Sequence, residues 1–307
     1  YAQYGMFGAA LIAIAVVGSA AGQHRLVARL PAQRPPQFSL RHAFGEIFDA
    51  FRERAFLVFA AGGLAAYVGQ GVNFSITQYV NNYVWKFDEL GFQAFPLVLA
   101  ASVVVMFMVV GPLHRRFGKP RSASGGALVA LVFYFTPFAL LLMGLWPQPG
   151  STISTVLVLA MLVFANVAGV VAIISATSMV AEIVEAYEER TGKRAEGTFY
   201  SGNWLVQKCA TGIGILATSL IVQSLGIEQG TPQDEVPKAV VTQLALVYMV
   251  VGTALGLLAA FWLDRFPISR ADHEARVAAR TARGDLREDN PLDEAFRADP
   301  DAHGITP

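Results

Sequence analysis

The stretch Met179–Lys208 reads MVAEIVEAYEERTGKRAEGTFYSGNWLVQK and joins two long apolar segments of the chain. It leaves the first segment, crosses a charged turn, and enters a second segment that runs from about 198 to 225. Lys208 lies roughly ten residues into this second segment, which corresponds to about 15 Å along a helix. The stretch therefore predicts two membrane-spanning helices with a lysine near the middle of the second.

Lys208 is the only Asp, Glu, Lys or Arg within the segments that we expect to span the membrane. A charged side chain at that depth costs about 3 kcal/mol or more, which favours a functional role. The alternative is a packing lysine whose ammonium group reaches a membrane surface, although both surfaces are far away. The neighbouring Cys209 is the single cysteine, so an internal disulfide is excluded, and we interpret it as a small packing residue.

The composition is that of an integral membrane protein. Hydrophobic residues make up 54% and charged residues 15% of the chain, against about 25% charged in an average soluble domain. The formal net charge is zero, so the charge balance gives no reason to expect a nucleic acid partner. The sequence predicts an all-α membrane protein with seven segments long enough to span a bilayer, at 4–22, 56–83, 94–113, 122–145, 153–181, 198–225 and 239–263.

The loops between these segments alternate in their content of Arg and Lys. Residues 23–55, 114–121, 182–197 and the tail after Asp264 are rich in bases, whereas the intervening loops carry at most one each. The positive-inside rule then places Tyr1 outside and Pro307 in the cytoplasm. The predicted parts are a transmembrane helix at 1–22, a cytoplasmic linker at 23–55, a six-helix bundle at 56–264 and a cytoplasmic tail at 265–307.

Within the linker, residues 39–54 read SLRHAFGEIFDAFRER, with apolar residues on one helical face and charges on the other. This pattern predicts an amphipathic helix that lies on the inner membrane surface.

Four polar residues of the 56–83 segment, Gln70, Asn73, Thr77 and Asn81, share one helical face. Such a face is costly in lipid, so it should look toward a water-filled cavity or toward other helices. Hydrogen bonds between helices alone would also explain it. Gln70 and Asn73 are therefore candidate substrate contacts, and the 153–181 segment shows a weaker pattern of the same kind, with Asn166, Ser175, Thr177 and Ser178.

The order of residues in Met179–Lys208 resembles the glycoside/pentoside/hexuronide:cation symporters, the melibiose permease family of the major facilitator superfamily. That family has a methionine-valine-alanine-acidic run, a second acidic residue three positions on, a basic turn, a Glu-Gly pair and a helix bearing lysine. The matching positions here are Glu182, Glu185, Arg194, Glu196, Gly197 and Lys208.

The turn GPLHRRFGKPR at 111–121 resembles a loop signature of major facilitator transporters, although a simple topology signal would also explain its bases. The resemblance implies twelve helices in two halves, each made of inverted three-helix repeats. The seven segments would be helix six and the second half, and the chain starts at Tyr1, so we expect the first residues of the natural protein to be missing. The coupling cation, Na⁺ or H⁺, would bind in the missing half, and no other cofactor or metal is expected.

The resemblance also implies roles for individual residues. Lys208 would face the central cavity, and Asn203 matches a hydrogen-bonding amide near the sugar. Ile173 stands where the family has a sugar-stacking Trp, and Trp204 stands where it has a nearby Thr, which weakens an assignment to melibiose itself. Sugars need amide or charged partners for their hydroxyls and an aromatic ring for their apolar face. Asn203, Lys208 and Trp204 supply these groups, although Trp204 would equally suit packing or an interface anchor.

A second group, Glu182, Glu185, Glu188 and Arg194, would form a cytoplasmic charged network that closes the inward side. The alternative for the three glutamates is an ordinary solvated helix end.

We therefore expect a secondary active transporter that carries a sugar or glycoside with a cation across the bacterial inner membrane, as a monomer when full length. The alternative is a related transporter of a lipid or another non-sugar solute. An enzyme is not expected, because every histidine lies outside the spans or at their edges. A passive channel or receptor would not be expected to carry the turn signature. The histidines are His24, His42, His114, His273 and His303.

Overall fold

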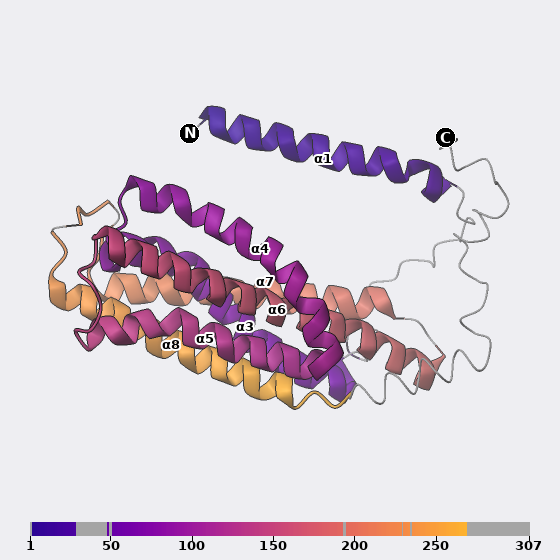
Figure 1. Ribbon diagram of the computed structural model, residues 1–307. Coiled ribbons are helices and arrows are strands. Elements are labelled where there is room, and N and C mark those ends of the chain that lie inside the picture. The colour runs from indigo at the N-terminus through magenta and orange to yellow at the C-terminus, as the bar shows by residue number, and fades with distance from the viewer. Residues whose placement is uncertain are drawn as a thin grey trace. The chain divides into compact units, whose positions relative to one another are not determined.

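The computed structural model describes residues 2–28, 48, 51–192, 195–228, 230–233 and 235–268. The chain divides into two compact units, residues 1–39 with 274–307 and residues 40–273. The described part of the first unit is one helix, α1 (Ala2–Ala28), which continues six residues beyond the end expected from hydropathy (Figure 1). The amphipathic helix predicted at 39–54 lies largely outside the described residues.

The described part of the second unit consists mainly of six long helices (Figure 1). Helix α3 is continued by a π-helical turn, η1, and no strand occurs among the residues that the structure describes. Counting α1, seven helices within the described ranges are long and apolar enough to cross a membrane, which confirms the all-α membrane fold predicted from the sequence. The elements are α3 (Arg54–Tyr79), η1 (Val80–Val84), α4 (Glu89–Phe117), α5 (Lys119–Leu142), α6 (Thr152–Thr191), α7 (Glu196–Ser224) and α8 (Lys238–Asp264).

Helix α6 extends ten residues beyond the predicted end at residue 181. The charged residues after 181 were expected in a turn, but hydropathy marks where a chain leaves lipid, not where its helix ends. No Gly or Pro follows until Gly192, whose φ of 69° ends the helix in the left-handed region. The connection to α7 is therefore much shorter than the predicted 182–197 turn.

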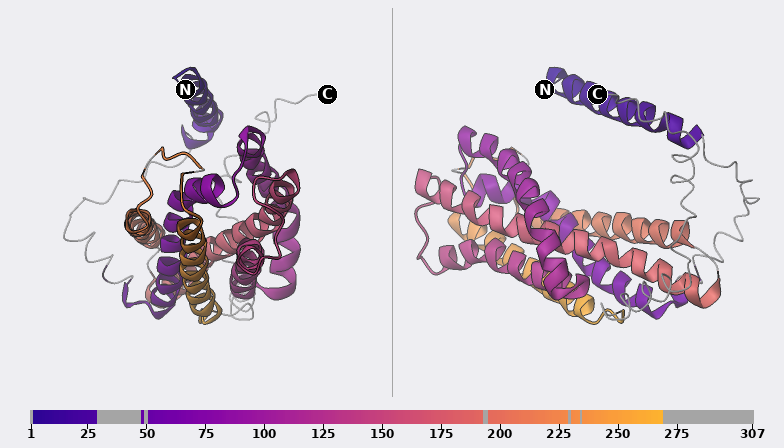
Figure 2. Two further views of the ribbon diagram at one scale, coloured as in Figure 1. Left: turned by 90° about the vertical axis from the view of Figure 1, so that its left-hand side faces the viewer. Right: turned by 45° about the vertical axis from the view of Figure 1, so that its right-hand side comes forward.

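The helices have a symmetric order of neighbours. The most extensive contacts join α4 to α6, α6 to α5, α5 to α8, α8 to α3 and α3 to α7, and Figure 2 shows these helices from two further sides. Exchanging α3 with α6, α4 with α7 and α5 with α8 leaves this set of contacts unchanged. Because consecutive helices run in opposite directions, the bundle consists of two inverted three-helix repeats, as the family resemblance implied.

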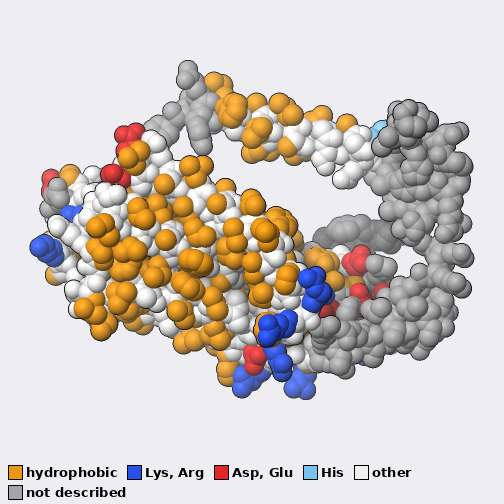
Figure 3. Space-filling model, in the orientation of Figure 1, with side chains coloured by type: hydrophobic (Ala, Val, Ile, Leu, Met, Phe, Trp, Pro, Cys, Tyr) orange, Lys and Arg blue, Asp and Glu red, His pale blue; other side chains and the backbone are white. Residues whose placement is uncertain are grey.

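Two apolar cores close the two ends of the bundle. One surrounds η1, where the rings of Trp85 and Phe138 lie 4.8 Å apart. The other lies at the opposite end, where the rings of Phe56 and Phe199 lie 5.4 Å apart. Hydrophobic side chains also cover the visible flank, and Lys and Arg side chains gather at one end of it (Figure 3). Such an apolar outer surface suits lipid as its solvent.

Candidate functional site

A cavity of about 450 Å³, which we call the polar cavity, opens at the surface of the bundle between α3, α5, α6, α7 and α8. This volume is in the range of small-molecule binding sites. The lining of the cavity combines a group of polar residues with a larger number of apolar residues and glycines. The described residues that line it include no Asp, Glu, Lys, Arg or His, so its polar groups are amides, hydroxyls and an indole. They are Tyr67, Gln70, Asn73, Tyr134, Asn166, Thr177, Asn203, Trp204, Gln207 and Tyr248.

Asn73 connects three helices at one end of this cavity. Its Oδ1 accepts a hydrogen bond of 2.5 Å from the Tyr248 hydroxyl of α8, and its Nδ2 lies 3.4 Å from the Tyr134 hydroxyl of α5. Thr77, one turn further along α3, donates to the backbone oxygen of Asn73 at 2.5 Å. The polar face of α3 was expected either to border a cavity or to form hydrogen bonds with other helices. Asn73 does both.

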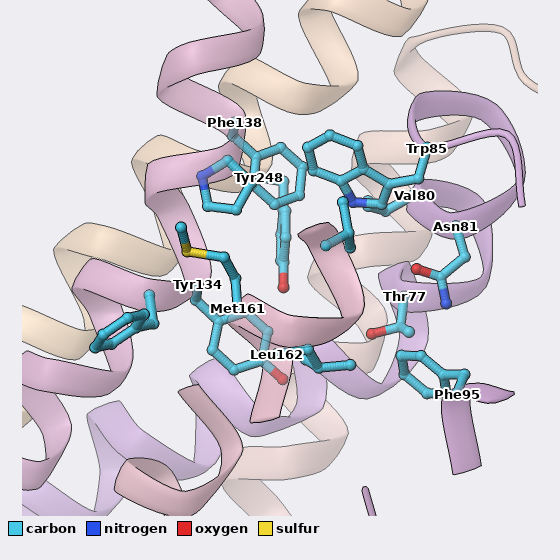
Figure 4. Close-up of a pocket in the computed structure, with 13 residues that line it drawn as sticks. Thr77, Val80, Asn81, Trp85, Phe95, Tyr134, Phe138, Met161, Leu162 and Tyr248 are labelled. Atoms are coloured by element: carbon cyan, nitrogen blue, oxygen red, sulfur yellow. The ribbon is translucent and has the colours of Figure 1, made fainter. Parts of the chain in front are cut away.

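The hydroxyl-bearing residues Thr77, Tyr134 and Tyr248 also line a second, smaller cavity of about 40 Å³ toward η1. Figure 4 shows their hydroxyls pointing into the space between their helices, with the rings of Trp85 and Phe138 beyond them. Because Tyr134 and Tyr248 line both cavities, the two tyrosines form a partition between them.

Asn203 is buried at the edge of the large cavity, and its Oδ1 accepts a hydrogen bond of 3.1 Å from the Tyr67 hydroxyl. Helix α7 reaches this position because two glycines let it pack closely on α3. A Cβ atom at Gly71 would lie 2.2 Å from the Thr211 oxygen, and one at Gly214 would lie 2.2 Å from the Val68 oxygen. Small residues at such crossings allow membrane helices to approach closely.

Trp204 lines the cavity while 57% of its surface stays exposed, so it lies at the cavity mouth. Lys208 is exposed one turn further along α7 and is not among the lining residues. Its ammonium nitrogen lies 5.4 Å from the centroid of the Trp204 ring, at cation–π distance. Cys209, which we interpreted as a packing residue, is exposed as well.

Four of the five predicted substrate contacts, Gln70, Asn73, Asn203 and Trp204, thus line one cavity, and Lys208 lies beside it. Sequence reasoning missed Tyr67, Tyr134, Gln207 and Tyr248. A tyrosine in an apolar segment is usually a packing residue. Its hydroxyl nevertheless needs a hydrogen-bond partner when it is buried, and this requirement could have indicated that the tyrosines lie near other polar groups.

Of the residues predicted for a charged network, Glu182 forms an ion pair in the structure. Its carboxylate is buried, with the residue 5% exposed, and lies 2.8 Å from the ammonium nitrogen of Lys119, a basic residue of the 111–121 turn. Nearby, Nε2 of His114 lies 2.7 Å from the hydroxyl of Ser175. Arg190 forms an ion pair of 2.5 Å with Glu53 before α3. These contacts join α3, α4, α5 and α6 at one end of the bundle, the α4–α5 end.

The other residues predicted for the network are Glu185, Glu188 and Arg194. Glu185 and Glu188 lie half-buried on α6 beyond Glu182. Arg194 lies outside the described residues.

Membrane-length helices in an inverted repeat, arranged around a polar cavity, define a multi-pass membrane protein. The profile of the family described as "MFS/sugar transport protein" matches residues 1–270, and the chain belongs to this family. It is also similar to a protein of Synechocystis sp. (strain ATCC 27184 / PCC 6803 / Kazusa) named as an uncharacterized symporter, with 29% identity over 198 residues. That match covers 57% of this chain and 36% of the relative, so the chain spans well under two thirds of the relative's length.

Proposed function

We propose that this chain contributes helix six and the second half of a transporter that moves a sugar or glycoside together with Na⁺ or H⁺ by alternating access. The observation that carries the proposal is the 450 Å³ cavity lined by amide, hydroxyl and indole groups without a charged side chain among its described lining. The relative named as a symporter supports coupling to a cation.

A sugar suits this lining better than an ionic or an apolar solute. Its hydroxyl groups both donate and accept, and the amides of Gln70, Asn203 and Gln207 offer both functions. An anion or cation would find no opposite charge among the described lining residues, and an apolar solute would leave the amides without partners. Trp204 at the mouth offers a ring on which the apolar face of a sugar can stack.

Lys208 is assigned to the entrance of the site. It lies beside Trp204 on the exposed side of α7, where it would meet the sugar or an acidic cation site of the first half. A lysine near the middle of a spanning helix is costly unless a partner offsets its charge. This cost supports an acidic partner for Lys208 in the first half of the transporter.

The α4–α5 end is assigned to the cytoplasm, with Tyr1 outside, in a bacterial inner membrane. Arg115, Arg116 and Arg121 are exposed at this end, which agrees with the positive-inside rule. Contacts between Lys119 and Glu182, with Glu185, Glu188 and Arg194 nearby in the sequence, would hold the cytoplasmic side closed. The full-length protein would act as a monomer, with its cation site in the first half and no other cofactor.

The test is uptake of a panel of labelled glycosides by vesicles that contain the full-length protein, with and without an inward sodium or proton gradient. We expect gradient-driven accumulation of at least one sugar and a loss of about tenfold or more in Lys208→Ala. Lys238→Ala, which changes a lysine at the start of α8, should retain wild-type uptake. If no sugar accumulates or competes, the sugar assignment fails and a non-sugar solute replaces it.

A further inference from the structure

A third cavity, of about 540 Å³, lies between α4, α5 and α6. It shares no lining residue with the polar cavity and belongs to a different face of the bundle. We call it the α4–α6 groove. Apart from Arg121 and the buried Ser122, the described residues that line it are aliphatic or aromatic side chains and glycines. The groove therefore differs in chemistry from the proposed sugar site.

The groove is open because of its small residues. A Cβ atom added at Gly125 would meet nothing within 4 Å, so that position faces empty space. A Cβ atom at Gly126 would lie 2.8 Å from the Ala168 oxygen, so this second glycine allows α5 and α6 to approach each other. Gly125 thus offers a position where the groove can be filled without a clash at the Cβ atom.

The length of the groove matches one leaflet of a bilayer. Its lining on α5 runs from Arg121 to Phe133, twelve positions further along the helix, which corresponds to about 18 Å at the helical rise. Half of a hydrocarbon core of about 30 Å is about 15 Å. At the inner end, the rings of Phe133 and Phe164 stack with centroids 5.1 Å apart. The groove thus runs from the membrane surface to about mid-membrane.

The charge of the groove lies at its surface end. Arg121 is exposed, and within the described residues its guanidinium group forms no ion pair. Lys119, two residues earlier, is already paired with Glu182. Arg116 is exposed in the last turn of α4, next to Phe117 of the groove wall. An apolar channel with a guanidinium group at its surface end is complementary to a lipid that carries an anionic phosphate.

We propose that the α4–α6 groove binds one acyl chain of an anionic phospholipid, whose phosphate pairs with Arg121. The bound chain packs between α4, α5 and α6 and holds α4 against the other two helices. The lipid is a resident ligand and not cargo, because the groove lies apart from the polar cavity. The proposal does not depend on the identity of the transported solute.

The test is native mass spectrometry of the delipidated full-length protein, titrated with phosphatidylglycerol and, separately, with phosphatidylcholine that has the same acyl chains. Arg121→Gln removes the charge, and Gly125→Leu fills the groove. Arg265→Gln is the control for charge at the same end of the bundle, because Arg265 is exposed after α8 and does not line the groove. Gly18→Leu is the control for filling, because it changes a glycine of α1 that also has nothing within 4 Å of an added Cβ atom.

We expect the tightest phosphatidylglycerol site to weaken about fivefold in Arg121→Gln, which corresponds to about 1 kcal/mol for one basic residue. Gly125→Leu should abolish this site, both controls should bind as wild type does, and Arg121→Lys should restore most of the affinity. The wild type should bind phosphatidylcholine about fivefold more weakly, and Arg121→Gln should bind both lipids alike.

The two variants act on different parts of the lipid, so either one that folds tests the proposal. Wild-type affinity in Gly125→Leu, or equal affinity of the wild type for both lipids, would overturn it. A dimer that Gly125→Leu disrupts would show instead that a second copy of the chain fills the groove. Displacement of the lipid by millimolar inorganic phosphate alone would indicate a simple anion site and would also overturn the proposal.

Discussion

The hydroxyl of Tyr248 donates a hydrogen bond of 2.5 Å to Oδ1 of Asn73, across 175 positions of sequence. Tyr248 is buried, and Asn73 also lies within reach of Tyr134. One amide therefore ties α3 to both α5 and α8, at the partition between the two cavities. This relationship makes Asn73 a determinant of stability as well as a candidate substrate contact.

We predict that Asn73→Leu destabilises the protein by about 1–3 kcal/mol, because the buried Tyr248 hydroxyl loses its acceptor. Thermal unfolding of the full-length protein in detergent measures the change. Gln78→Leu, at an exposed position of the same helix, should leave the unfolding temperature close to that of wild type. Equal unfolding temperatures for Asn73→Leu and wild type would show that the bond contributes nothing to stability.

The close crossing of α3 and α7 gives a second prediction. Gly71→Ala and Gly214→Ala each place a Cβ atom 2.2 Å from a backbone oxygen, so the helices must separate. We expect a loss of about 1–3 kcal/mol for either substitution, measured by thermal unfolding. Gly212→Ala is the control, since its Cβ atom meets nothing within 4 Å and alanine has the higher helix propensity. Its unfolding temperature should be unchanged or higher.

The two ion pairs at the α4–α5 end should differ in strength. Lys119→Ala leaves the buried Glu182 without its partner, which should cost about 3 kcal/mol. Arg190→Ala breaks a pair whose arginine side chain is 62% exposed, so it should cost less than about 1 kcal/mol. Double-mutant cycles with Glu182→Ala and Glu53→Ala measure both couplings by thermal unfolding. Similar coupling energies for the two pairs would contradict this ranking.

The bond between Tyr67 and Asn203 gives a prediction that rests on the proposed sugar site. Tyr67→Phe removes the donor that orients the Asn203 amide, so the KM for the transported sugar should rise about tenfold, or about 1.4 kcal/mol. Tyr200→Phe, at an exposed position of α7 outside the cavity lining, should keep the wild-type KM. Uptake kinetics in vesicles measure both values. An unchanged KM in Tyr67→Phe would remove Asn203 from the site.

The helices were largely predictable because the thickness of a bilayer sets the length of an apolar segment. Hydropathy located all seven spans, and its largest errors are at the ends of α1 and α6, which continue six and ten residues beyond the predicted ends. Both helices continue into polar sequence, as at Glu182, where no residue breaks the helix although the apolar run has ended. Hydrophobic patterns therefore predicted where the helices lie better than where they end.

The site was predictable only where polarity stood out within an apolar segment. Gln70 and Asn73 were found because amides are rare in lipid, whereas Asn203 was found through the family resemblance, and all three line the cavity. Tyr134 and Tyr248 were missed, since their rings look like packing residues until their hydroxyl partners on α3 are known. Those partners lie far away in sequence, and local patterns carry no information about such contacts.

The uncharged lining of the polar cavity determines how membrane voltage can act on this part of the protein. An electric field performs work only on charges that move through it, about 2.3 kcal/mol per elementary charge for 100 mV. The described lining of the cavity contains no ionised side chain, so a rearrangement of these residues carries no net charge across the field. Lys208 lies near the middle of α7, whereas the charged groups of the other described helices lie toward their ends. Any voltage sensitivity of these helices is therefore expected to arise from Lys208.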